Sequence, residues 1–192
     1  MNGSETGLRR LVQVLHDLGV PFVIGGSLAS SVHGIPRATM DVDLVADLRV
    51  EQIRPLADAL GADFYADASA LEQAVRTGRP FNLIHYASSY KFDLFPLGAD
   101  PFQQTELRRR VLVAVEFPGS GLLELPVVTA EDSVLSKLDW YRRGGEVSSR
   151  QWEDILGVIR TSGDSLDRDY LRTWARHLGV EDLLERALDE AT

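Results

Sequence analysis

The chain of 192 residues contains no cysteine. This absence excludes disulfide bonds, zinc sites built from thiolates and catalysis by a cysteine nucleophile. The chain also lacks any apolar run near the ~20 residues that a membrane-spanning helix needs, and residues 1–10 are polar and poor in leucine. We therefore expect a soluble, untargeted protein of a reducing compartment, the cytoplasm.

Positive charge is scarce, with 20 Lys and Arg residues against 29 Asp and Glu residues and a net charge of −9. Because affinity for nucleic acid comes mostly from neutralised phosphates, this balance opposes loose binding of DNA or RNA unless a local basic patch exists. Two arginine clusters offer such a patch, at 108–110 and 142–143. Both also stand at the ends of expected helices, where the helix dipole alone favours cations.

The most informative segment begins with a glycine turn. Residues 21–24 form an apolar run typical of a short buried strand, and Gly25, Gly26 and Ser27 follow directly. Glycines permit a tight turn and the close approach of a ligand to the backbone. Residues 27–33 then favour a short helix, whose N-terminal N–H groups point back toward the glycines and suit an anion. Phosphate is the expected ligand of this turn.

A strand that carries two acids follows. Residues 40–45 alternate, so Asp41 and Asp43 share one face with their Cα atoms roughly 6.5–7 Å apart. The one obvious cation in the sequence that could pair with them is Arg37. Two carboxylates so placed repel each other unless a proton or a metal ion intervenes. A solvated strand face produces the same alternation, but the glycine turn in front of it favours a shared divalent cation.

This segment, from Gly25 to Asp43, resembles the nucleotidyltransferase superfamily, whose fold is that of the DNA polymerase beta catalytic domain. The signature of that family is a glycine followed by Gly or Ser, a short helix, and a strand with two acids separated by one residue. The chain also matches the variant in which Arg37 and Thr39 precede the two acids.

The resemblance implies a third carboxylate on a neighbouring strand. The strand expected over 90–96 supplies Asp93, on the face opposite Phe92 and Leu94. The alternative is that Asp93 only pairs with Lys91 on an exposed strand. Three converging carboxylates suit Mg²⁺, which prefers hard oxygen ligands together with substrate phosphates.

The pattern of elements changes near residue 130. Before it, the sequence predicts strands that interleave with helices. The expected strands are 21–25, 41–46, 81–87, 90–96, 111–117 and 122–128, and the expected helices are 5–18, 27–33, 51–60, 68–77 and 100–109. After Thr129, a typical helix cap, only helices are expected, over 130–143, 148–161, 167–178 and 180–190. We predict an α/β (α+β) fold, with a small mixed β-sheet and flanking helices in a nucleotidyltransferase core over 1–129 and an all-helical C-terminal region over 130–192.

The C-terminal helices resemble the AbiEii-type branch of the superfamily, known from bacterial toxin–antitoxin and phage-defence systems. In that branch a lysine in the first C-terminal helix and an aspartate in the second complete the active site, and Lys137 and Asp154 occupy the matching positions. Lys137 lies at the edge of an apolar stripe, so its ammonium can reach a triphosphate from a half-buried stem. Asp154 lies roughly opposite the apolar face of its helix, which leaves a solvated position open. Trp140, Trp152 and Trp174 are expected as core aromatics rather than as base-stacking platforms.

The resemblance implies transfer of a nucleoside monophosphate from an NTP, such as ATP, to an acceptor hydroxyl. Asp41, Asp43 and Asp93 would hold two Mg²⁺ or Mn²⁺ ions, and Asp93 would assist deprotonation of the acceptor. The residues expected to bind the nucleotide are Gly25, Gly26, Ser27, Arg37, Thr39 and Lys137.

The acceptor stays open between an RNA 3′ end, a protein hydroxyl and a small molecule such as an aminoglycoside, and an antitoxin protein is an expected partner. Two further alternatives remain. One is a non-catalytic nucleotide-binding module of the same fold, and the other is an unrelated α/β protein in which the two acids coincide by chance.

Overall fold

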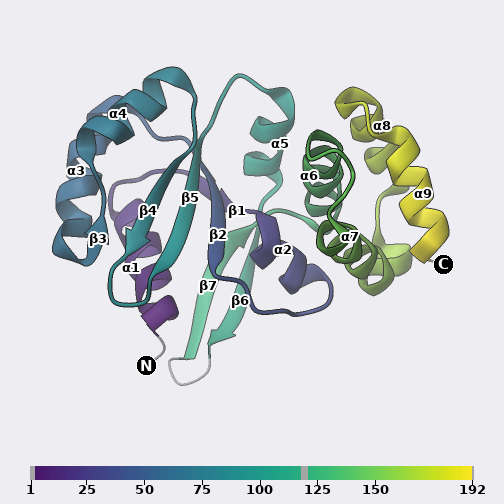
Figure 1. The fold of residues 1–192 in the computed structure, drawn as a ribbon, viewed down its shortest axis with the longest axis horizontal. Coiled ribbons are helices and arrows are strands. Elements are labelled where there is room, and N and C mark those ends of the chain that lie inside the picture. The colour runs from purple at the N-terminus through teal and green to yellow at the C-terminus, as the bar shows by residue number, and fades with distance from the viewer. Residues whose placement is uncertain (1–2, 118–120, 192) are drawn as a thin grey trace. The chain divides into compact units, whose positions relative to one another are not determined.

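The computed structural model describes residues 3–117 and 121–191, and Figure 1 shows their fold. Residues 1–2, 118–120 and 192, which belong to the predicted ranges 1–129 and 130–192, lie outside the described residues. The described chain forms two compact units, one from residues 3–24, 39–117 and 121–127, the other from residues 25–38 and 128–191. A domain boundary at residue 129 stays a prediction. None of the described helices is both long and apolar enough to cross a membrane.

The first unit is built on a mixed sheet. Within the described residues its strands are β1 (Phe22–Ile24), β2 (Asp41–Ala46), β3 (Phe64–Tyr65), β4 (Phe81–His85), β5 (Tyr90–Pro96), β6 (Val111–Phe117) and β7 (Gly121–Val127). They lie side by side in the order β3-β4-β5-β2-β1-β7-β6. β2 runs parallel to β5 and β1 parallel to β7, while the other neighbours are antiparallel. This mixed sheet confirms the predicted α/β fold class.

Four α-helices of the described chain belong to this unit: α1 (Gly3–Asp17), α3 (Val50–Leu60), α4 (Ala68–Thr77) and α5 (Pro101–Arg109). α1 packs against α3, α3 against α4, and α4 against β4, and this group is seen beside the sheet in Figure 1. The core face of the central strands carries Leu44 of β2 with Phe92 and Leu94 of β5, all 0% exposed. Because strand side chains alternate, the intervening acids of β2 and β5 lie on the other face.

The second unit is helical. It consists of α2 (Gly26–His33), α6 (Ala130–Arg143), α7 (Ser149–Ser162), α8 (Arg168–Leu178) and α9 (Glu181–Ala191), with α2 packed against α6 and α7. Side-chain caps begin three of the helices, since Thr129, Ser148 and Asp167 each accept a hydrogen bond from a backbone N–H three residues later. The predicted run of C-terminal helices is confirmed.

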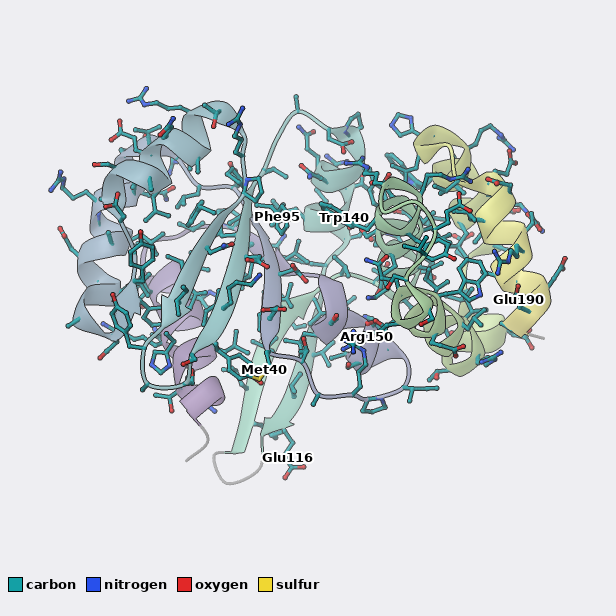
Figure 2. The ribbon with its side chains drawn as sticks, in the orientation of Figure 1. Met40, Phe95, Glu116, Trp140, Arg150 and Glu190 are labelled. Carbon is teal, nitrogen blue, oxygen red and sulfur yellow. The ribbon has the colours of Figure 1, made fainter. Side chains whose placement is uncertain are left out.

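The three tryptophans differ in burial. Trp152 is 7% exposed, lies 5.2 Å from the Tyr141 ring and donates a hydrogen bond to Glu190, which Figure 2 labels on α9. It is the expected core aromatic. Trp174 is half-buried. Trp140, also labelled in Figure 2, is 51% exposed, so its placement in the core is a wrong prediction. Trp140 is in the last turn of α6, and the Arg143 guanidinium lies 5.8 Å from the centroid of its ring.

Candidate active site

The predicted metal-binding acids share one face of β2 and β5. In the parallel pairing of these strands Asp43 stands opposite Asp93, and Asp41 stands opposite Lys91. Paired residues of neighbouring strands project to the same side of a sheet, here the side away from Leu44. The fold therefore brings Asp41, Asp43 and Asp93 together from two segments about fifty positions apart in the chain.

Lys91 places an ammonium among these acids. Its Nζ lies 2.9 Å from Asp93 Oδ2 and 3.7 Å from Asp41 Oδ1. The hydrogen bond with Asp93 raises the pKa of Lys91 above its ordinary value against the opposing effect of desolvation, and the nearby carboxylate charges add to the rise. Arg37 is the one obvious cation for Asp41 and Asp43 in the sequence, and strand pairing supplies another, Lys91, which is distant from these acids in the chain. The Asp93–Lys91 pair considered above is present.

The fit of this cluster to a divalent metal can be judged from its donors. Within the described residues, no three His, Cys, Asp or Glu side chains form a group that could hold a metal ion as they stand. The donors are nevertheless carboxylate oxygens, the type that Mg²⁺ and Mn²⁺ prefer. Asp93 Oδ1 is buried and has no hydrogen-bond partner, although Oδ2 of the same carboxylate binds Lys91. A buried acceptor of this kind suits a cation, so the residues fit the metal that the fold family implies.

Four of the other predicted site residues meet in the second unit, around Asp154 of α7. The Asp154 carboxylate accepts hydrogen bonds from Arg37 Nε, from Arg37 Nη2 and from Lys137 Nζ, each at 2.8 Å. Arg37 Nη2 also donates to Ser27 Oγ at 2.6 Å. We refer to Ser27, Arg37, Lys137 and Asp154 as the Asp154 network. The two-bond Arg37–Asp154 pair fixes the guanidinium plane, and Lys137 adds a point charge.

Asp154 is not solvated, because its side chain is 8% exposed. Burial alone would raise the pKa of Asp154, but the hydrogen bonds from Arg37 and Lys137 outweigh burial and lower the pKa. The sequence left a solvated position of Asp154 open because the spacing of residues along a helix describes α7 alone. Residues 25–38 pack on α7 and supply the guanidinium that covers the polar side of the helix.

The glycine turn opens α2. Gly26 has a φ of +59°, a left-handed conformation that favours glycine over every other residue. Gly25 is the N-cap and supplies no side-chain hydrogen bond to the first N–H groups of α2. A Cβ built on Gly25 would meet nothing within 4 Å, so the backbone is open at this point. Uncapped N–H groups beside an open backbone are suited to an anion, as the sequence predicts.

Thr39 belongs to the first unit and shapes the start of β2. Its Oγ1 donates to the Asp41 carbonyl at 3.1 Å and accepts from the Asp41 N–H at 3.4 Å. The Tyr90 hydroxyl donates to the Thr39 carbonyl at 2.6 Å, which ties this segment to β5. Met40, which lies between Thr39 and Asp41 in the chain and is labelled in Figure 2, is 59% exposed. Thr39 thus fixes the backbone from which Asp41 projects.

Lys91 is the residue that the sequence reasoning missed as a member of the site. A signal for it was present, because the chain has only two lysines, Lys91 and Lys137, among its 20 basic residues. Both lysines bind a candidate catalytic acid, Asp93 in the first unit and Asp154 in the second. Arginine serves at every other basic position, so the choice of lysine marks both places.

Comparison of the sequence with curated proteins gives no match. The solution structure of the antibiotic-resistance factor ANT(2'')-Ia is similar to this chain with a TM-score of 0.53 and 15% identity, over 97% of this chain and 100% of that chain. An antigenic nucleotidyltransferase-like protein from Paracoccidioides brasiliensis has a TM-score of 0.52 and 18% identity, over 95% of this chain and 91% of that chain. The crystal structure of ANT(2'')-Ia with adenylyl-2''-tobramycin has a TM-score of 0.52 and 12% identity, over 91% of this chain and 95% of that chain.

At these identities the likeness shows the fold alone. The family is shown by the sequence, since the model of the family described as nucleotidyl transferase AbiEii toxin, type IV TA system, matches residues 9–192. This match spans nearly the whole chain, the glycine turn and the C-terminal helices included. The chain belongs to the AbiEii nucleotidyltransferase family and is a nucleotidyltransferase.

Proposed function

We propose that the protein transfers a nucleoside monophosphate from an NTP to an acceptor hydroxyl in a reaction that requires Mg²⁺ or Mn²⁺. The observation that carries this proposal is the shared face of Asp41, Asp43 and Asp93, where Asp93 keeps a buried oxygen without a hydrogen-bond partner. These three residues would hold the metal, which supplies positive charge to the reacting phosphate when bound.

Within the first unit we assign Asp93 the role of receiving the proton of the acceptor hydroxyl. Its Oδ1 is free of any donor, whereas its Oδ2 is bound to Lys91. Its side chain is 18% exposed, so the group is shielded from water but within reach of a substrate. A partly desolvated carboxylate has two oxygens, so one can bind the metal while the other receives the proton of the acceptor.

Within the second unit we assign the triphosphate to the N-terminus of α2 and to the cations of the Asp154 network. The N–H groups after Gly25, the Ser27 hydroxyl, Arg37 and Lys137 together offer donors and two positive charges. Asp154 would act as a positioning residue that holds both cations. Transfer of this type relies on positioning and electrostatics more than on covalent chemistry.

Thr39, between Arg37 and Asp41 in the sequence, stays a predicted nucleotide contact.

For the acceptor we propose an RNA 3′ end, in a type IV toxin–antitoxin system of the cytoplasm with an antitoxin as protein partner. The description of the matched family supports the toxin–antitoxin setting. The complex of ANT(2'')-Ia with adenylyl-2''-tobramycin concerns a small-molecule product of that protein and makes such an acceptor the competing outcome of the test.

The test is label transfer from each α-³²P-labelled NTP, in Mg²⁺ or Mn²⁺, to total RNA, total protein and a set of aminoglycosides. We expect label in RNA with the parent protein and none with Asp43→Asn. Asp58→Asn, which changes an exposed acid of α3 in the same chemical way, is the matched control and should retain full transfer. Label in a small molecule instead would replace the RNA acceptor, and no transfer to any acceptor would favour the non-catalytic module.

A further inference from the structure

We propose that Lys91 is a built-in competitor of the divalent metal, an ammonium that binds the carboxylates of β2 and β5 and must leave them when the metal is loaded. The inference rests on the proposed function, because it concerns a metal held by Asp41, Asp43 and Asp93. It adds a residue outside that ligand set which controls how readily the set is filled.

The geometry places the ammonium where a metal would compete with it. Lys91 stands opposite Asp41 and two positions before Asp93 on the same strand, so its side chain shares the face of the three acids. Its Nζ contacts Asp93 Oδ2 at 2.9 Å. A Mg²⁺ ion lies about 2.1 Å from a carboxylate oxygen, so an ion on Asp93 Oδ2 itself would lie no more than about 5 Å from the ammonium. Like charges at that distance repel strongly, and one cation weakens the binding of the other.

The two lysines of the chain differ in how firmly they are held. Lys137 is 9% exposed and binds a carboxylate that is itself 8% exposed. Lys91 is 39% exposed, and its second partner, Asp41, lies at 3.7 Å and is 54% exposed. A lysine is a compact charge on a flexible four-carbon stem, so Lys91 can turn from the acids to solvent without disturbing the sheet. Lys91 can therefore be displaced from its carboxylates by another cation, whereas Lys137 is held firmly on Asp154.

Asp93 offers a route for the exchange. One of its oxygens binds Lys91, and the other is buried without a hydrogen-bond partner. An arriving cation can bind the unpartnered oxygen while Lys91 still neutralises the other. The ammonium then leaves as the metal gains its further ligands from β2. The acids are in this way paired with a cation before and after loading, which limits their mutual repulsion.

The direct test is Mn²⁺ binding without nucleotide, followed by the electron paramagnetic resonance signal of free Mn²⁺. Lys91→Met keeps most of the stem and removes the charge, and we expect it to bind Mn²⁺ at least ~10-fold more tightly than the parent. Arg79→Met is the matched control, because it removes one positive charge from an exposed position of the same unit. Both variants change the net charge equally, so Arg79→Met should stay within about two-fold of the parent.

Thermal unfolding is a second measurement, and it uses two different substitutions of Lys91. In EDTA, Lys91→Met and Lys91→Gln should both have a lower melting temperature than the parent, and Mn²⁺ should raise that temperature more in the variants than in the parent. Adding Asp93→Asn to Lys91→Met should abolish the tightened binding.

The outcomes separate the two proposals. A parent that binds Mn²⁺ while Lys91→Met binds it equally or more weakly overturns the competition and leaves the proposed function standing. Absence of Mn²⁺ binding in the parent and in Lys91→Met, even with an NTP present, overturns the metal-dependent function and this inference with it.

Discussion

The Asp154 carboxylate binds two cations, Arg37 and Lys137. Its substitution tests whether the residues of the Asp154 network stabilise one another. Asp154→Asn keeps the shape of the side chain but removes the charge that Arg37 and Lys137 share. Because a buried ion pair that loses one partner leaves uncompensated charge, we expect the free energy of unfolding to fall by about 3 kcal/mol at neutral pH. Urea unfolding measures the change, and Glu153→Gln, at an exposed neighbouring position, is the control.

The same variant has a predictable dependence on pH. The pKa of Asp154 is lowered in the folded protein, so the stabilisation is present above the ordinary carboxyl pKa of about 4 and is lost as the pH falls through the folded-state value. The difference in unfolding free energy between the parent and Asp154→Asn should therefore shrink as the pH falls below about 4. A difference that stays constant over this range would mean that the carboxylate charge is not what stabilises the network.

Lys137 tests whether the helical unit takes part in the chemistry. Lys137→Met keeps the stem and deletes the charge, so we expect nucleotide transfer to fall by at least ~10-fold, equivalent to ~1.4 kcal/mol. The loss of stability should be smaller than for Asp154→Asn, because both hydrogen bonds from Arg37 to Asp154 remain. Arg150→Met removes an exposed charge, labelled in Figure 2, from the start of α7 and should leave transfer unchanged. Full transfer in Lys137→Met would remove the Asp154 network from the reaction.

The acids of the first unit should differ in their effect on stability without metal. Asp93 pairs with Lys91 at 2.9 Å and is 18% exposed, so Asp93→Asn should cost about 1 kcal/mol. Asp41 is 54% exposed and lies 3.7 Å from the same ammonium, so Asp41→Asn should change stability by less than about 0.5 kcal/mol. Thermal unfolding in EDTA measures both. An equal loss of stability in Asp93→Asn and Asp41→Asn would show that Lys91 does not bind Asp93 more strongly than Asp41.

The contact of α2 with α7 depends on a glycine at the end of α2. A Cβ on Gly34 would lie 2.8 Å from the Val158 backbone nitrogen and 2.9 Å from the Gly157 carbonyl carbon. Backbone atoms cannot yield as a flexible side chain does, so Gly34→Ala should push the two helices apart and cost about 2 kcal/mol or more. Gly25→Ala is the matched control, since its Cβ would meet nothing within 4 Å. Equal melting temperatures for the two variants would contradict this packing.

The helices and strands were mostly predictable because each has local signals. The strand 41–46 and the helix 130–143 have the predicted bounds, set by alternation in one case and by the Thr129 cap in the other. β3 was missed because it is two residues long, too short for any periodicity, and owes its existence to pairing with β4. Local pattern fails where a neighbour across the sheet decides the structure.

The site was predictable as a set of residues but not as a set of pairs. The glycine turn and the acids of β2 are encoded within about twenty positions, and their spacing carries the signal. The Arg37–Asp154 pair joins residues 117 positions apart, and the Lys91–Asp41 pair depends on the register of β2 with β5. Neither separation leaves a local trace, which is why the sequence did not reveal Arg37 as a partner of Asp154 or Lys91 as a partner of Asp41.

The charge of the whole molecule constrains any RNA acceptor. The net charge is −9, and several arginines of the last helices are engaged with acids. Arg142 pairs with Asp182 and Glu146, and Arg143 pairs with Asp139. Further pairs join α8 and α9 or lie within α9, namely Arg172–Glu185, Arg176–Glu181 and Arg186–Glu190. The cluster at 142–143, one of the two patches expected to attract phosphates, is thus largely neutralised by neighbouring carboxylates.

RNA binding should in consequence depend only weakly on salt. Each phosphate of a single strand that is neutralised contributes about −0.7 to the slope of log K against log salt concentration. In the cluster at 108–110, Arg108 donates a hydrogen bond to Thr105 Oγ1 and Arg110 donates one to the Leu107 carbonyl. With three arginines as the basic surface, we expect few phosphate contacts and a slope no steeper than about −2. Fluorescence anisotropy of a labelled RNA oligonucleotide, from about 50 to about 200 mM salt, measures the slope. Arg108→Gln with Arg110→Gln should flatten it, whereas Arg142→Gln with Arg143→Gln should not. A parent slope of about −5 or steeper would mean that RNA opens the arginine–carboxylate pairs to gain an extended basic surface.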